Sequence, residues 1–205
     1  MTVASGTAGG PATALATGIP SGNAYSRRTI RNSKPVDSKT MTASDVELER
    51  LAKRVGRHLL KTRRHAATAE SCTGGWVAKA LTDIAGSSDW FVEGFVTYSN
   101  ESKVRRLGVP IAVLQKKGAV SEATVRAMAA GALRRSKAQV AVAVTGIAGP
   151  GGAVPGKPVG TVWLAWASRR NGAIRVAAAL KRFRGDRETV RRKTVRAALQ
   201  GLLTR

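Results

Sequence analysis

Apolar residues first recur at helical spacing in a segment that begins at residue 44. Residues 44–47 (Ser-Asp-Val-Glu) form a capping box, and one face of the predicted helix carries Leu48, Leu51, Val55 and Leu59. A basic run at residues 61–65 ends the helix, where positive charge complements the helix dipole. The folded part of the chain is therefore predicted to start at residue 44.

Short apolar runs and helical patterns alternate through the rest of the chain. Strands are predicted at residues 66–69, 90–98, 140–144, 161–167 and 174–183. Helices are predicted at residues 74–84 and 101–107, after the cap Ser121-Glu122, and after the cap Asp186. The last two strands are predicted to pair antiparallel through Arg170-Asn171-Gly172. This order predicts an α/β fold, a three-layer α/β/α sandwich with a mixed, mainly parallel sheet.

Residues 1–40 have a different composition, dominated by small and polar residues with few large apolar ones. We predict a disordered basic leader at residues 1–40 and one domain at residues 44–205. Two interpretations of the leader stay open. It resembles a transit peptide in being Arg- and Ser-bearing and poor in acids. The favoured interpretation is a dispensable tail, and it stays open whether Met41 is the true start of the protein.

Composition limits the partners and the cofactors. The 205-residue chain has a formal charge of +23 and a pI near 11.7, which suggests nucleic acid, an anionic surface or an anionic substrate. The single cysteine, Cys72, excludes an intramolecular disulfide and a cysteine-based metal cluster, and His58 and His65 lack partners at ligand spacing. No metal and no cofactor are expected. Without an apolar run of about 18 residues we expect no membrane span and a cytoplasmic location.

Residues 68–75 (Thr-Ala-Glu-Ser-Cys-Thr-Gly-Gly) carry the most informative candidate chemistry. Ser71 is predicted to lie at a strand-to-helix turn, beside the backbone N–H groups of Thr73, Gly74 and Gly75. The first N–H groups of a helix lack partners within the helix, so they suit an anion or a developing oxyanion. The alternative is that these residues only form a turn and a helix cap.

A base for Ser71 is sought among residues other than histidine, because neither histidine lies in a motif-like setting. A buried lysine of lowered pKa can activate a serine, often with a tyrosine in the relay. Tyr98 and Lys103 follow the predicted strand at residues 90–98 and could reach one pocket. The alternative is a core tyrosine and a solvated lysine, and the spacing alone favours that alternative.

Two later segments could bind a phosphate. Residues 145–150 (Thr-Gly-Ile-Ala-Gly-Pro) follow the most apolar strand, and ligands bind at the carboxyl ends of such strands. The segment is not a Walker A loop. Arg184 and Arg187 flank the start of the last helix, where guanidinium groups could contact a phosphate. The alternative there is an Asp186 cap with solvated arginines.

Six ordered motifs together resemble the nicotinamide-nucleotide amidohydrolase (PncC) family, which is also the C-terminal domain of the competence-damage protein CinA. The motifs are residues 69–75, 94–100, 118–121, 145–150, 157–162 and 185–187. The resemblance covers about residues 44–203. The chain departs from the family in a loop at 151–156 without acidic residues and in its basic leader.

The resemblance implies an enzyme that deamidates nicotinamide mononucleotide to nicotinate mononucleotide and ammonia, in pyridine nucleotide salvage. It implies a Ser-Lys-Tyr arrangement without a metal, with Ser71 as nucleophile and Lys103 and Tyr98 as its assistants. The substrate-binding residues that we expect are Thr73, Gly74, Gly75, Asn100, Thr145, Gly146 and Arg187. A small-molecule substrate is the expected partner, and a homo-oligomer stays open. The rival interpretation is a basic nucleic-acid-binding protein that uses the α/β domain as a platform. This interpretation is less favoured, because aromatic residues are few and the motifs concentrate where a pocket for a small ligand is expected.

Overall fold

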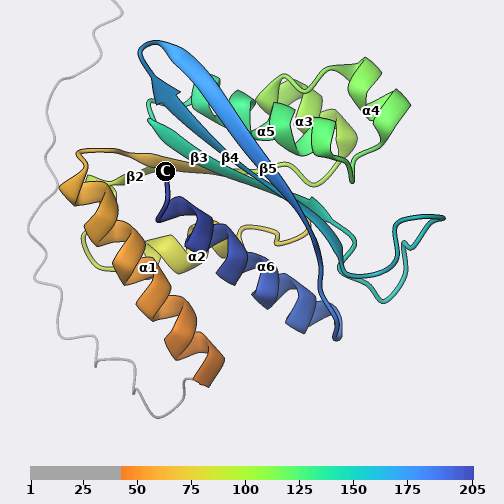
Figure 1. The fold of residues 1–205 in the computed structure, drawn as a ribbon, viewed down its shortest axis with the longest axis horizontal. Coiled ribbons are helices and arrows are strands. Elements are labelled where there is room, and N and C mark those ends of the chain that lie inside the picture. The colour runs from red at the N-terminus through yellow and green to blue at the C-terminus, as the bar shows by residue number, and fades with distance from the viewer. Residues whose placement is uncertain (1–42) are drawn as a thin grey trace, which may run out of the picture. The chain divides into compact units, whose positions relative to one another are not determined.

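The structure, a computed structural model, describes residues 43–205 (Figure 1). The leader predicted at residues 1–40 lies outside the described residues, and the structure does not describe the side chain of Ser44, the first residue of the predicted capping box. In the described part, no helix is long and apolar enough to span a membrane.

A five-stranded sheet forms the middle layer, with the strand order β2-β1-β3-β4-β5. Its strands are β1 (Ala66–Glu70), β2 (Phe91–Val96), β3 (Val140–Gly146), β4 (Thr161–Arg170) and β5 (Ala173–Arg182). β1 pairs in parallel with β2 and β3, whereas β4 runs antiparallel to both β3 and β5. Four of the five strands therefore run in the same direction, and the predicted mixed, mainly parallel sheet is confirmed.

Helices cover both faces of the sheet (Figure 1). One face packs against α1 (Ala43–Lys61), α2 (Trp76–Thr82) and α6 (Arg187–Leu202), and the other against α3 (Asn100–Leu107), α4 (Ile111–Lys117) and α5 (Glu122–Arg135). Each face buries its own apolar cluster. The three-layer sandwich expected from the sequence is thus the observed architecture.

Local chemistry explains how the elements differ from those predicted. The helix predicted from residue 74 starts two residues later, because Gly74 and Gly75 have φ angles of 62° and 94° that continue no right-handed helix. The hairpin between β4 and β5 is confirmed, and its two loop residues Asn171 and Gly172 have positive φ as a tight turn requires. The seven-residue helix α4 was not predicted, since it is too short to show a period.

Candidate active site

Ser71 is the first residue after β1, at the carboxyl edge of the parallel strands. Its N–H donates to the Val144 carbonyl of β3 at 3.1 Å, which continues the pairing of the two strands by one residue. The chain then turns into α2 through Gly74 and Gly75. The predicted strand-to-helix turn is therefore present, and the sheet fixes the position of the serine at the edge where α/β proteins bind ligands.

Lys103 reaches Ser71 from the first turn of α3. Its Nζ lies 3.1 Å from Ser71 Oγ, 2.8 Å from the Thr97 carbonyl and 3.0 Å from the Tyr98 carbonyl. Lys103 is only 1% exposed, so the alternative of a solvated lysine does not hold. The structure brings together two residues that are 32 positions apart in the sequence.

Burial lowers the pKa of Lys103 to about 8, because desolvation penalises the charged ammonium. A neutral amine has two N–H groups and one lone pair. The carbonyls of Thr97 and Tyr98 can accept the two N–H groups, and the lone pair is then left facing the Ser71 hydroxyl. In that state Ser71 donates to Lys103, which is the arrangement that a general base requires.

Tyr98 is connected to this pair through its backbone only. Its side chain is 63% exposed, which excludes the core role considered for it. Its hydroxyl accepts a hydrogen bond from Arg187 Nη2 at 3.3 Å. Within residues 43–205 no hydrogen bond joins the tyrosine hydroxyl to Ser71 or Lys103. The Tyr98 side chain therefore contacts the candidate phosphate-binding residue Arg187 and not the serine and lysine that it was expected to assist.

The buried carboxylate of Glu70 holds the turn that follows Ser71. Glu70 is 1% exposed and accepts from the Thr73 hydroxyl at 2.6 Å and from the N–H groups of Gly75 at 3.0 Å, Val77 at 3.0 Å and Ala78 at 2.8 Å. An anion at a helix N-terminus satisfies donors that have no partner within the helix. Sequence reasoning assigned Glu70 no role, because Glu70 lies six residues before the start of α2 and gives no local capping signal.

The contacts of Glu70 narrow the choice of oxyanion donors in the turn. Glu70 takes the N–H of Gly75, and the Gly74 N–H donates to the Ser71 carbonyl at 3.0 Å. Neither the Cys72 N–H nor the Thr73 N–H donates to a backbone carbonyl of the residues that the structure describes. These two N–H groups, next to Ser71 in the chain, are the donors that a ligand could use.

We expect Glu70→Ala to destabilise the protein by roughly 3 kcal/mol or more, because four donors lose one buried acceptor. A change of that size lowers the melting temperature of a domain of this length by about 6–12 °C, which differential scanning calorimetry measures. The control is Glu101→Ala. Glu101 is exposed, and its ion pair with Arg105 is long, at 3.9 Å, so its loss should change stability by less than about 0.5 kcal/mol. Equal losses in both variants would contradict the capping role.

Two residues at the turn, Cys72 and Arg191, were given no role in the site from the sequence. Burial raises the pKa of the Cys72 thiol to about 12, so this cysteine stays protonated and unreactive beside Ser71. Arg191 on α6 donates to the Thr73 carbonyl at 2.7 Å, and its guanidinium lies 5.2 Å from the centre of the Trp76 ring. Arg191 thus holds the turn after Ser71 from α6. In the sequence, the only sign of this contact is that Arg191 lies one helical turn after Arg187.

The other predicted substrate residues lie at the end of β3 (Thr145 and Gly146), at the start of α6 (Arg187) and at the start of α3 (Asn100). The Thr145 hydroxyl donates to the Ala119 carbonyl at 2.9 Å in a buried setting, and a side chain at Gly146 would collide with Val162. Arg187 Nη1 donates to the Gly149 carbonyl at 2.7 Å, so Arg187 joins the glycine-rich loop to Tyr98. These contacts place Tyr98 and Arg187 next to that loop.

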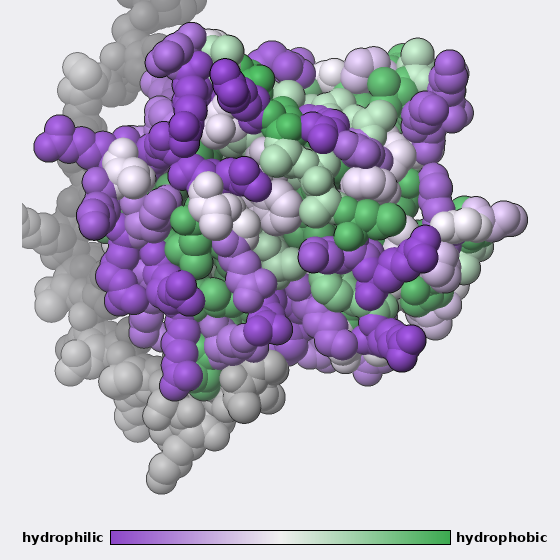
Figure 2. Space-filling model, in the orientation of Figure 1, coloured by the Kyte–Doolittle hydropathy of each residue, from purple (hydrophilic) through white to green (hydrophobic). Residues whose placement is uncertain are grey.

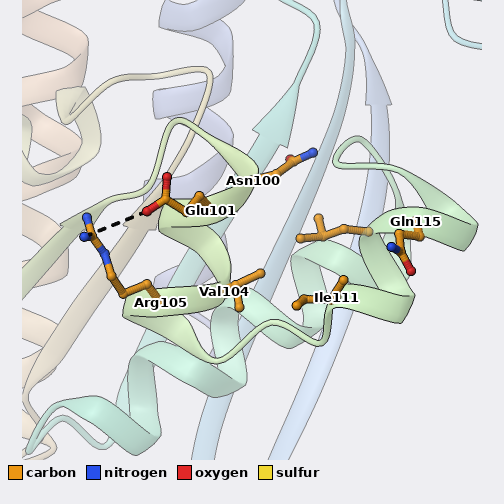
Figure 3. A pocket seen from close by; sticks show the side chains of 7 residues that line it. Asn100, Glu101, Val104, Arg105, Ile111 and Gln115 are labelled. Carbon is orange, nitrogen blue, oxygen red and sulfur yellow. Dashed lines mark ion pairs between the residues drawn. The ribbon is translucent and has the colours of Figure 1, made fainter.

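Asn100 lines a separate pocket of about 490 Å³ between α3 and α4 (Figure 3). Val104 and Ile111 face each other across it, and the ion pair between Glu101 and Arg105 lies on its α3 side (Figure 3). Neither member of the Ser71–Lys103 pair lines this pocket. The pocket is therefore distinct from the site of the proposed chemistry.

Among residues 43–205 no group of three or more His, Cys, Asp and Glu side chains is arranged to hold a metal ion. The chemistry offered by the site is that of a serine hydroxyl and a buried amine.

A family model described as the CinA C-terminal domain matches residues 48–205, so the chain belongs to the CinA C-terminal domain family. The nicotinamide-nucleotide amidohydrolase PncC of Pseudomonas putida is 54% identical over 153 residues, covering 75% of this chain and 93% of the relative. That of Escherichia coli is 52% identical over 159 residues, covering 78% and 94%.

Solved structures of the same superfamily share the fold. The competence damage-inducible protein A of Klebsiella pneumoniae matches with a TM-score of 0.73 at 41% identity, covering 77% of this chain and 96% of that one. A competence/damage inducible protein of Agrobacterium tumefaciens matches with a TM-score of 0.72 at 47% identity, covering 78% and 96%. The fold predicted from the order of the elements and the family indicated by the six motifs are both confirmed.

Proposed function

We propose that the protein is an amidohydrolase that converts nicotinamide mononucleotide to nicotinate mononucleotide and ammonia. The observation that carries the proposal is the 3.1 Å contact between Ser71 Oγ and the buried amine of Lys103. Two relatives that are more than half identical over three quarters of this chain are named for that activity, which supports the choice of substrate. A Ser-Lys pair needs no metal for amide hydrolysis.

In the proposed mechanism Ser71 attacks the carboxamide carbon while its proton moves to the neutral amine of Lys103. The N–H groups of Cys72 and Thr73 would stabilise the oxyanion. The Lys103 ammonium then protonates the amide nitrogen, the C–N bond breaks, and ammonia leaves a nicotinoyl ester on Ser71. Water attacks the ester with Lys103 again as base, which releases nicotinate mononucleotide and restores the serine. The cationic pyridinium of the substrate makes its carbonyl a better electrophile.

Tyr98 contributes in two ways in this proposal. Its backbone carbonyl accepts from Lys103 and helps to orient the amine. Its exposed hydroxyl contacts Arg187, which supports a role in substrate binding rather than in proton relay. The remaining expected contacts, from Asn100, Thr145 and Gly146, stay predictions.

The test is ammonia release by the purified full chain. We expect release from nicotinamide mononucleotide with equimolar nicotinate mononucleotide, and much slower release from nicotinamide riboside, which lacks the phosphate. No release from either compound would overturn the proposed function.

Arg187→Ala should raise KM for nicotinamide mononucleotide by roughly one to two powers of ten, because a charge-assisted bond to the phosphate is lost. The KM for nicotinamide riboside should change little. Steady-state kinetics with both substrates measure the effect as a ratio of kcat/KM values. Arg184→Ala, at an exposed arginine two residues before the Asp186 cap of α6, is the control. An unchanged ratio in Arg187→Ala would remove Arg187 as the phosphate contact and make Arg184 the next candidate.

A further inference from the structure

Ten cationic residues gather at the end of the sheet opposite Ser71, and we name this group the basic end. Its members are Arg63, Arg64, Arg105, Arg106, Arg134, Arg135, Lys137, Arg169, Arg170 and Arg175. β1 and β3 begin at this end, whereas Ser71 follows the other end of β1, about 17 Å away along the five-residue strand. Nine of the ten are exposed, and only Arg64 is half-buried.

Contacts between four segments make the basic end one continuous surface. The backbone of His65 pairs with Gln139, and the Arg169 N–H donates to the Gln139 carbonyl at 2.9 Å. Arg169 also donates to the Leu133 carbonyl at the end of α5. The Arg135 guanidinium lies 3.7 Å from where a side chain at Gly108 would begin, which joins the end of α3. Figure 2 shows mostly hydrophilic side chains over the end where the hairpin of β4 and β5 lies.

No acidic residue belongs to the four segments of this surface, although the described part of the chain has eleven. None lies in residues 62–65, 104–110, 134–139 or 168–175. Asp89 borders this surface at the start of β2, beside the start of β1 and on the side of β1 away from β3. The one ion pair of the group joins Arg105 to Glu101 at 3.9 Å between two exposed side chains. If the protein were merely Arg-rich throughout, acidic residues would be mixed with the arginines here, as they are on α1 and α6. The separation of arginines from acidic residues in these segments indicates an anionic partner.

The residue types select among anionic partners. Nine of the ten cations are arginines, whose planar forks bind phosphate through two donors. The exposed large hydrophobic residues of the described part lie outside the four segments. Proteins that bind a membrane surface normally insert apolar side chains in addition to using charge, and proteins that bind single-stranded nucleic acid stack aromatic side chains on the bases. A surface of arginines without either fits the regular phosphate backbone of a duplex.

We propose that the basic end binds the phosphate backbone of double-stranded nucleic acid without sequence preference. This binding is a second property of the protein and is independent of the amidohydrolase reaction, because the two sites lie at opposite ends of the sheet. Affinity comes from release of counterions by the arginines, so it falls steeply as salt rises.

The test compares two triple variants of the full chain by fluorescence anisotropy with a short mixed-sequence DNA duplex over a series of salt concentrations. Arg134→Gln/Arg135→Gln/Arg170→Gln removes three exposed charges from the basic end. Arg169 is left in place because it caps α5. The control Arg50→Gln/Arg54→Gln/Arg182→Gln removes the same charge from exposed positions on α1 and at the far end of β5. Ammonia release from nicotinamide mononucleotide checks that both variants remain folded.

We expect the basic-end variant to bind the duplex roughly tenfold or more weakly than wild type, with a salt slope lower by about 2–3, while the control stays close to wild type. Both variants should keep wild-type ammonia release. Equal weakening by the two variants, or none by either, would mean diffuse charge or another segment binds the duplex, and would overturn the proposal. Tighter binding to the single strand or to phosphatidylserine vesicles than to the duplex would overturn it as well.

Discussion

Ser71→Ala is expected to lower kcat for ammonia release from nicotinamide mononucleotide by roughly three powers of ten or more, because no other group can form the acyl ester. The fold should survive, since the backbone of Ser71 makes the contacts to β3 and to Gly74, and the hydroxyl makes one contact, to Lys103. The measurement is single-turnover kinetics together with the melting temperature, which should stay within a few degrees of wild type.

The matched control is Cys72→Ala, at the adjacent residue of the same turn. The thiol of Cys72 is a nucleophile by residue type, but its raised pKa keeps it protonated. We expect this variant to keep activity within about tenfold of wild type. A larger loss in Cys72→Ala than in Ser71→Ala would exchange the roles of the two residues.

Lys103→Met is expected to lower kcat/KM by a similar factor, because methionine fills much of the volume but cannot accept the serine proton. It should not lower the melting temperature greatly at neutral pH, since it removes a buried amine whose charged form is disfavoured by burial. The measurement is the same pair of assays on the purified variant.

Lys103→Arg tests whether Lys103 acts as a general base or only as a positive charge. Arginine stays protonated in proteins, so it supplies a cation but no lone pair, and we expect no rescue. Recovery of activity in the arginine variant would show that Lys103 acts only through its charge.

The sheet and its helices could be predicted because each depends on patterns local to the chain. The continuous apolar run at β3, the Asn171-Gly172 turn and the Asp186 cap each act within a few residues, and each appears where the sequence indicates. The helix α4 escaped prediction because seven residues show less than two full turns of periodicity.

The pairing of side chains across the site could not be predicted from spacing. Tyr98 and Lys103 are five residues apart, but β2 ends before Tyr98, whose side chain stays exposed, while α3 turns Lys103 into the interior. Glu70 was equally hidden, since its partners lie on the first turn of α2 and only the folded turn brings them together. The family resemblance indicated candidate residues, and the fold supplies the contact between Ser71 and Lys103.

The pH dependence of kcat/KM for nicotinamide mononucleotide tests the neutral Lys103 base most directly. Lys103 must be unprotonated to accept the serine proton, and its pKa is lowered to about 8, so activity is lost as pH falls through that value. We expect kcat/KM to rise about tenfold per pH unit up to about pH 8 and then to level off, with this dependence absent from the residual activity of Lys103→Met. A flat profile between about pH 5 and pH 9 in the wild-type protein would contradict the account.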